Sequence, residues 1–588
     1  MNAVGSVPTS PPTSPPPTPA PAPRAVRPAR SRSEGPIWLL AGALLAAVLT
    51  WPLVRSLGTV VPQDAGDPVA QAWQAAWGGH AVLTQPGRLF EGNTFFPATP
   101  SLAFSDSLLG YAPAALFGEG TTAALVRYNL LFLFAYALCF AGAGLLAREI
   151  GLRVPAAVVA GAAYAWAPWR MAQNGHLNIL STGGVALALF LLLSGYRRGR
   201  PWQVAAGWLV AVWQLSLGFA LGIWFCYLLA AIAVALGGLW LVRGRPSLLG
   251  LPHARALIAA TVGGGGLLLL TAGLLARPYL QVVGANPDAA RGLAEIEFYS
   301  PPLRSLLVAD STSRVWGQTT AVLRETLPWA PEQALFPGLA VVVLAVLGLQ
   351  WRGARRELRI GLVLALAGVL VLSFGTALLD GRFYRPLYDH LPGWDGLRTP
   401  GRLAFLWTLL LALLAGLGAE RLTDAAGRLG RPHLPVGTAL SVGTALSVGT
   451  AWALAAVVLY EGSPRLPLAT PPPPPAGLAG LTYPLVHLPS TPGADSTFMW
   501  WSTDGFGRIA NGNASYAPPE LVSLREQTGA FPDAASVRLL RERGIRTVVV
   551  HRTLVPGTAW EAAADRPVIG LGISRRERGD LVVFDLEG

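Results

Sequence analysis

Two aspartates three positions apart, Asp64 and Asp67, follow the first strongly apolar segment of the chain. Two such carboxylates beside an apolar surface can hold one raised pKa, and that group can then accept a proton. The same oxygens could also bind a divalent cation such as Mg²⁺ or Mn²⁺. Because Pro68 follows Asp67, an ordinary helix start is the alternative, with Asp67 near the N-cap and Pro68 at N1. The sequence leaves both roles open for Asp67.

The polar stretch around these aspartates, 56–120, contains two secondary candidates, His80 and Asp106. Apolar and aromatic residues recur within 68–85 at intervals of three and four. This spacing predicts an amphipathic helix lying on the membrane surface. For Asp106 the alternative role is to cap a second interfacial helix over 107–117.

Three arginines and one histidine could supply positive charge for an anionic group. Arg170 and His176 lie in a short segment with two tryptophans, while Arg398 and Arg402 flank a Thr-Pro turn just before an apolar span. A guanidinium matches phosphate oxygens with a bidentate fork, so these residues predict binding of a phosphate or pyrophosphate at headgroup level. The alternatives are snorkelling to lipid headgroups for Arg398 and Arg402 and a solvated loop position for His176.

The composition places these residues in a mainly α-helical membrane protein. Of the 588 residues, 52% are hydrophobic and only 13% are charged. Apolar stretches of spanning length recur, which predicts a polytopic bundle of about eleven transmembrane helices. We expect spans over 37–55, 122–147, 154–170, 177–195, 202–217, 219–241, 256–276, 334–350, 358–379, 402–420 and 436–460. The segment 202–241 fits either two short spans or one re-entrant hairpin.

The arginines cluster in the short connections on one side of the predicted membrane. The positive-inside rule therefore predicts a cytoplasmic N-terminus, and an odd number of spans predicts an extracytoplasmic C-terminus. This distribution accounts for the net charge of +12, so nucleic acid is not an expected partner. The longer segments 56–120, 277–333 and 380–401 would then face outside, and 277–333 is long enough to cover a site as a partly helical lid.

The composition also divides the chain into four parts. We predict a disordered Pro-rich cytoplasmic tail over 1–35, a transmembrane domain over 36–460, a Pro-rich linker over 461–478 and an extracytoplasmic α/β domain over 479–588. Within the last part, the pattern predicts a helix over 533–543 and strands over 545–551 and 580–585.

Three short stretches resemble the GT-C class of polytopic glycosyltransferases. They are Gly66-Asp67-Pro68 through Trp77, Pro168 to His176 with the continuation GHLNIL, and LPGWDGLRTPGRL before the tenth span. Within this class the chain is similar to bacterial mannosyltransferase-like proteins with an outer C-terminal domain, and LLRERGIRTVVVHR resembles their outer α/β element. The resemblance implies an inverting hexosyltransferase with a polyprenyl-phosphate-sugar donor and a catalytic acid in the first outer loop. Carried onto this sequence, the first choice for that acid is Asp67 and the second is Asp64.

The residues and the resemblance together predict an integral membrane glycosyltransferase working among membrane lipids at the outer face. Its acceptor would be a cell-envelope glycan, lipid or protein. The donor phosphate would be held by Arg398, Arg402, Arg170 and His176. The alternatives are a transporter or flippase of lipid-linked glycans and a non-catalytic assembly scaffold. A transporter should have ionisable residues at mid-membrane and repeated halves, whereas the predicted spans have almost no such charges and show no repeat.

Overall fold

The computed structural model describes residues 34–244, 253–351, 353–429 and 436–586, and most of them are helical. Each of the eleven predicted spans contains a helix. These helices are α1 (Glu34–Leu49), α3 (Gly120–Ile150), α4 (Val154–Ala165), α6 (Gly183–Arg198), α7 (Pro201–Leu217), α8 (Phe219–Val242), α9 (Ala254–Ala285), α13 (Leu339–Leu349), α14 (Arg356–Ser373), α16 (Ala404–Leu429) and α17 (Val436–Glu461). The tail predicted over 1–35 falls outside the described residues except for its last two, which begin α1.

Six helical segments among the described residues are long and apolar enough to cross a membrane. They are Gly120–Ile150, Leu177–Arg198, Phe219–Val242, Ala254–Ala285, Pro400–Leu429 and Ser441–Glu461. Three shorter apolar helices, α1, α4 and α13, accompany them. The chain is therefore a multi-pass membrane protein. The segment 202–241 forms two helices, α7 and α8, because the backbone of Gly218 is extended between them.

The centre of the bundle consists of α3 and α16. Their most apolar windows are 83% and 89% buried, whereas those of α8 and α9 are only 22% and 11% buried. The outer helices thus present apolar surface to lipid. Small residues allow close packing at the centre: a Cβ on Gly348 or Gly418 would collide with the backbone of the facing helix at the crossing of α13 and α16.

The helix predicted over 68–85 exists as α2 (Asp67–Thr84), but its apolar face is covered by other parts of the protein instead of being exposed. Its residues are buried on nearly every face, because it packs against α3, the 3₁₀ turn Leu109–Ala115 and α18 (Pro492–Trp501). The second interfacial helix expected over 107–117 is only that 3₁₀ turn, and it begins after Leu108, which has a left-handed backbone.

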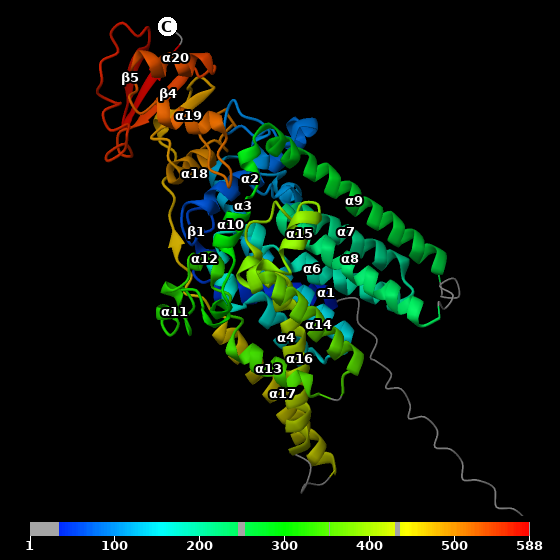
Figure 1. Ribbon diagram of the computed structural model, residues 1–588. Helices are drawn as coiled ribbons and strands as arrows, with labels where there is room; N and C mark the ends of the chain where they lie inside the picture. The colour runs from blue at the N-terminus through cyan, green and yellow to red at the C-terminus, as the bar shows by residue number, and fades with distance from the viewer. Residues whose placement is uncertain (1–33, 245–252, 352, 430–435, 587–588) are drawn as a thin grey trace, which may run out of the picture.

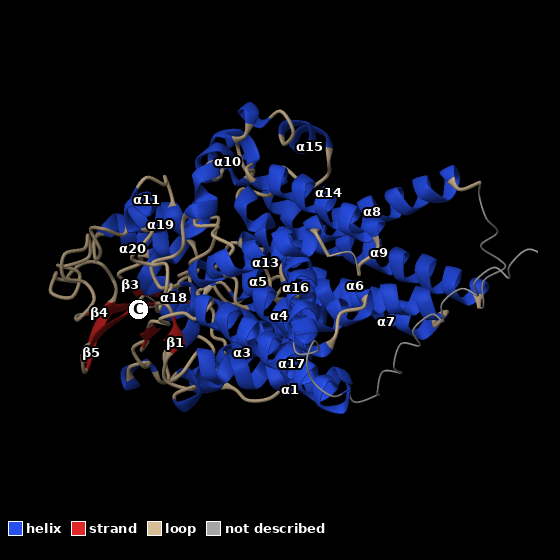
Figure 2. Cartoon of the chain, turned by 90° about the horizontal axis from the view of Figure 1, so that it is seen from below, coloured by secondary structure: helices blue, strands red, loops and turns tan. Residues whose placement is uncertain are grey.

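The C-terminal region is a small α/β unit. Its four strands are ordered β3 (Leu485–Leu488), β4 (Thr547–His551), β6 (Leu581–Asp585) and β5 (Ser574–Arg578); β3 and β4 run parallel and the other pairs antiparallel. Helices α18, α19 (Pro519–Gln527) and α20 (Ala534–Glu542) complete it. The predicted helix corresponds to α20 and the two predicted strands to β4 and β6. Figure 2 shows the strands gathered at one end of the molecule.

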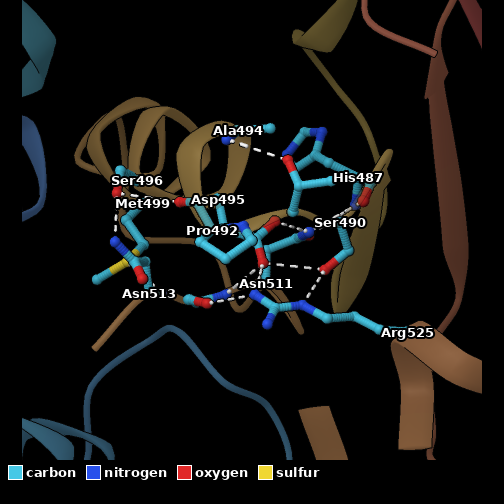
Figure 3. A network of polar contacts seen from close by, with 12 residues as sticks. His487, Ser490, Pro492, Ala494, Asp495, Ser496, Met499, Asn511, Asn513 and Arg525 are labelled. Atoms are coloured by element: carbon cyan, nitrogen blue, oxygen red, sulfur yellow. Dashed lines mark hydrogen bonds and ion pairs between the residues drawn. The ribbon is translucent and has the colours of Figure 1, made fainter. Parts of the chain in front are cut away.

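A buried polar network stabilises this C-terminal region (Figure 3). The carboxylate of Asp495 on α18 accepts hydrogen bonds from Arg525 at 2.7 Å, from Asn511 Nδ2 at 2.7 Å and from Ser490 at 2.9 Å. Asn511 also bonds the backbone of His487 on β3: its Oδ1 accepts from the N of His487 and its Nδ2 donates to the carbonyl of His487. The network therefore fixes the loop that contains Asn511 against the sheet.

That loop connects the C-terminal region to the first polar segment of the membrane bundle. Phe95 N donates to the carbonyl of Asn511 at 3.0 Å, and Ile509 N donates to the carbonyl of Asn93 at 2.8 Å. In the linker, β2 (Leu468–Ala469) pairs antiparallel with β1 (Val61–Pro62), just before Asp64. In Figure 1 the C-terminal region, orange and red, lies at one end of the molecule, with its helix α18 beside α2.

Candidate active site

Asp67 and His176 meet across two separate segments. Asp67 is the first residue of α2 and follows the N-cap residue Gly66, and its Oδ2 lies 2.9 Å from Nε2 of His176. His176 occupies the N-cap position of the short helix α5 (Leu177–Leu180). The Asp67 side chain is 52% exposed and that of His176 is 22% exposed. The Asp67 carboxylate thus contacts His176 while about half of its surface is open.

The surroundings of Asp67 favour its ionised form. The hydrogen bond with His176 lowers the pKa of Asp67, burial opposes this shift, and the charges of His176, Arg402 and Arg398 lower the pKa further. The raised pKa expected for an Asp64–Asp67 pair is therefore wrong for Asp67. Both arginines therefore act on the Asp67 carboxylate through their charge.

Gln71 lies one helical turn after Asp67 and therefore on the same face of α2. Its Oε1 accepts a hydrogen bond from the backbone N of Leu177 at 2.6 Å, and its Nε2 donates to Asn178 Oδ1 at 3.1 Å. Asp67 and Gln71 together thus hold the 176–178 segment. Neither Gln71 nor Asn178 was predicted, because isolated amides give no recognisable spacing signal.

Asp106 is connected to the same segment. Its Oδ2 accepts a hydrogen bond from Asn178 Nδ2 at 2.7 Å, and its Oδ1 accepts one from the backbone N of Ala220 at 3.3 Å. Ala220 lies in the first turn of α8, so Asp106 binds the beginning of a helix distant in sequence rather than capping 107–117. Asp106 therefore lies at the edge of the Asp67 site and links it to α8.

Asp64 has a local role. Its Oδ1 accepts a hydrogen bond from Gly66 N at 2.8 Å, which closes the turn before α2, while Asp67 faces His176. The two carboxylates thus have different partners. Within the described ranges, no three His, Cys, Asp or Glu side chains are grouped as a metal site requires. The divalent ion considered for Asp64 and Asp67 thus stays a prediction.

Arg398 and Arg402 are each oriented by a carboxylate. Arg402 donates to both oxygens of Glu332 on α12 (Ala330–Gln333), with Nε 3.0 Å from Oε2, and both side chains are largely buried. Arg398 lies 3.3 Å from Oε1 of Glu295 on α10 (Leu293–Tyr299) and above the ring of Tyr299. Both carboxylates belong to the segment 277–333, which thus borders the site.

Arg170 lies inside the bundle instead. It is 1% exposed, its Nη2 donates to the carbonyl of Leu180 at 2.6 Å and its Nη1 donates to Thr182 at 3.1 Å. The rings of Tyr136, Tyr164 and Trp169 surround its guanidinium. These contacts occupy Arg170 within the protein core, so the structure does not bring it together with Arg398 and Arg402.

His80 is also separate from the site. It lies thirteen residues after Asp67 on α2, about 20 Å away at 1.5 Å per residue. Its ring stacks on Phe506 at 4.2 Å, and burial lowers its pKa. His80 therefore helps to pack the C-terminal region against α2.

Neither a family model nor a curated protein matches the sequence. Among solved structures, the chain is similar to the arabinofuranosyltransferase AftD from Mycobacteria, with a TM-score of 0.53 and 15% identity over 95% of this chain and 42% of that chain. The archaeal oligosaccharyltransferase AglB from Archaeoglobus fulgidus, in complex with an inhibitory peptide and a dolichol-phosphate, gives a TM-score of 0.44 and 13% identity over 89% and 70% of the two chains. This chain has the fold of the GT-C class of membrane glycosyltransferases and spans less than half of the AftD chain.

Proposed function

We propose that this chain is an integral membrane glycosyltransferase that transfers a sugar from a polyprenyl-phosphate donor to a cell-envelope acceptor at the outer face of the membrane. The observation that carries the proposal is the half-exposed carboxylate of Asp67, which contacts His176 and whose pKa is lowered by His176, Arg402 and Arg398. In such a site the carboxylate can bind the acceptor hydroxyl, and the two guanidinium groups can bind the departing phosphate.

The proposed reaction is an inverting displacement. The acceptor oxygen forms a bond to the anomeric carbon while the bond from that carbon to the phosphate oxygen breaks. The phosphate leaves with the electron pair, and Arg398 and Arg402 balance its charge. Asp67 orients the acceptor hydroxyl and receives its proton as the new bond forms. The lowered pKa of Asp67 keeps it ionised, so that it can accept a hydrogen bond from the acceptor hydroxyl before the proton is transferred.

The surface of α8 supports a lipid-linked donor. The 3₁₀ turn Pro400–Leu403, which contains Arg402, contacts α8, and α8 is largely exposed from Ala230 onward. A polyprenyl chain lying along α8 would bring its phosphate to the arginines. The proposed topology, with the N-terminus in the cytoplasm, places this end of α8 at the outer leaflet.

Transfer from a labelled polyprenyl-phosphate sugar by the purified protein in nanodiscs tests this function. We expect Asp67→Asn to reduce transfer by roughly 10²–10⁴-fold, the usual contribution of a positioned acid or base, without loss of the folded protein. Asp64→Asn is the matched control, since asparagine can still accept the hydrogen bond from Gly66 N. Wild-type transfer by Asp67→Asn would remove Asp67 from the mechanism.

A further inference from the structure

Both arginines proposed to bind phosphate are already paired with glutamates. The carboxylate of Glu332 accepts hydrogen bonds from Nε and Nη2 of Arg402. Among the described residues it is the only side chain that hydrogen-bonds this guanidinium. Glu295 lies 3.3 Å from Arg398 and also 3.3 Å from Arg291. The Glu332 side chain is 8% exposed, so water screens its charge poorly.

Glu332 is held in place by contacts of its own helix, independently of Arg402. Next to it on α12, Gln333 Nε2 donates to the carbonyl of Phe298 at 2.9 Å, and Gln173 Nε2 donates to the carbonyl of Pro331 at 2.8 Å. A ligand that approaches Arg402 therefore meets the Glu332 charge at a fixed position. The negative charge of Glu332 therefore acts on any ligand bound to Arg402.

The charges around the two arginines are closely balanced. Three guanidinium groups and one histidine stand beside four carboxylates, and the groups are linked to one another by ion pairs or by their mutual effects on pKa: Arg291, Arg398, Arg402 and His176, with Asp67, Asp106, Glu295 and Glu332. A ligand with one negative charge can share Arg402 with Glu332. Each additional negative charge is repelled by carboxylates without gaining a further cation.

We propose that Glu295 and Glu332 determine the charge of the lipid donor, so that the site prefers a singly charged polyprenyl phosphodiester to a polyprenyl diphosphate. This inference rests on the proposed function, because it concerns the same phosphate site. It assigns the two glutamates a role in specificity: each reduces the positive potential that a diphosphate requires. Arg398 and Arg402 supply the hydrogen bonds, and the glutamates limit how much anionic charge these arginines can accept.

Binding of two probes with the same prenyl chain tests the inference. One probe is the methyl ester of a polyprenyl phosphate, with one negative charge, and the other is the polyprenyl diphosphate. We expect the wild-type protein in nanodiscs to bind the methyl ester more tightly. Glu332→Gln and Glu295→Gln should each shift the ratio of the two dissociation constants toward the diphosphate by about tenfold, as expected for removing one nearby charge from a partly buried site.

The control is Glu297→Gln, on an exposed glutamate of the same short helix as Glu295, which should leave the ratio unchanged. Glu295→Gln is the second variant if Glu332→Gln fails to fold, since the Glu295 side chain is 30% exposed. An unchanged ratio in both glutamate variants would overturn the inference. Equal weakening of both probes would also overturn it, because the glutamates would then only position the arginines.

The binding ratio separates this inference from the proposed function, because binding requires no transfer. If the ratio shifts as expected but the wild-type protein transfers no sugar, the proposed function fails and the inference on anion charge stands. If the wild-type protein transfers sugar and the ratio stays constant in both variants, the function stands and the inference fails.

Discussion

Asp495 and Asp67 are both carboxylates held by side chains from other segments, yet their environments differ in two respects. Asp495 is completely buried and accepts hydrogen bonds from three side chains, whereas Asp67 is about half exposed and pairs with His176. Burial raises the pKa of Asp495 to about 6, whereas the hydrogen bond with His176 lowers that of Asp67. A fully satisfied, enclosed carboxylate stabilises structure, while an ionised and accessible one is available to a ligand.

The largest expected effect is the loss of structure around Asp495. Asp495→Ala leaves Arg525 without its buried partner, and breaking such a pair costs about 3–5 kcal/mol. We expect faster hydrogen exchange in β4 and a lower free energy of unfolding for the C-terminal region. Asp67→Asn provides the contrast, with unchanged exchange in β4. Protection of β4 at the wild-type level in Asp495→Ala would contradict the comparison between the two carboxylates.

A second contrast concerns Arg402 and Arg170, which the sequence suggested for the same role. Arg402→Lys keeps the positive charge but loses the bidentate fork. We therefore expect the KM for the lipid donor to rise about 10–100-fold, which corresponds to the loss of one hydrogen bond to a charged group. Arg170→Lys should instead lower the thermal stability of the bundle, because the Arg170 contacts with Leu180 and Thr182 are internal. Steady-state kinetics and thermal unfolding of both variants would measure this. A selective KM increase in Arg170→Lys would reverse the assignment.

The difference between these arginines also shows what the sequence could reveal. Helix positions follow from apolar segment length, because a helix must satisfy its own backbone in lipid. The residue types at Asp67, His176, Arg398 and Arg402 indicated chemistry; the structure brings Asp67 and His176 into contact, and the charges of both arginines lower the pKa of Asp67. The inward direction of Arg170 was not predictable, since it depends on the packing of tyrosines from two other helices.

Long-range contacts account for the remaining differences. The helix α2 has an amphipathic pattern, but its exposure depends on α18, more than 400 residues later in the chain. Glu332 was missed for the same reason, because only the folded chain brings α12 to Arg402. Pattern analysis thus identified residues with suitable chemistry, but it could not identify the groups that orient or neutralise them.

The smallest expected effect is a change in pH dependence when His176 is removed. The hydrogen bond from His176 is the largest cause that lowers the pKa of Asp67 below the ordinary value of 3.8. In His176→Ala, only the charges of the two arginines still lower the pKa of Asp67, while burial still raises it. The pKa of Asp67 should therefore be higher than in the wild-type protein. The acid limb of kcat/KM for transfer should move to higher pH than in the wild-type protein.

The same shift has a defined sign for stability. Because the native pKa of Asp67 is lowered, its ionised form stabilises the fold above pH 3.8, and this contribution disappears as the pH falls through the lowered value. His176→Ala should therefore make the free energy of unfolding less dependent on pH in the acid range. Sugar transfer by this variant should instead become more sensitive to acid. His80→Ala, on the same helix but about 20 Å from Asp67, is the control with an unchanged acid limb. An acid limb that stays in place in His176→Ala would show that His176 does not control the ionisation of Asp67, and the contrast between an enclosed Asp495 and a tuned, accessible Asp67 would then rest on exposure alone.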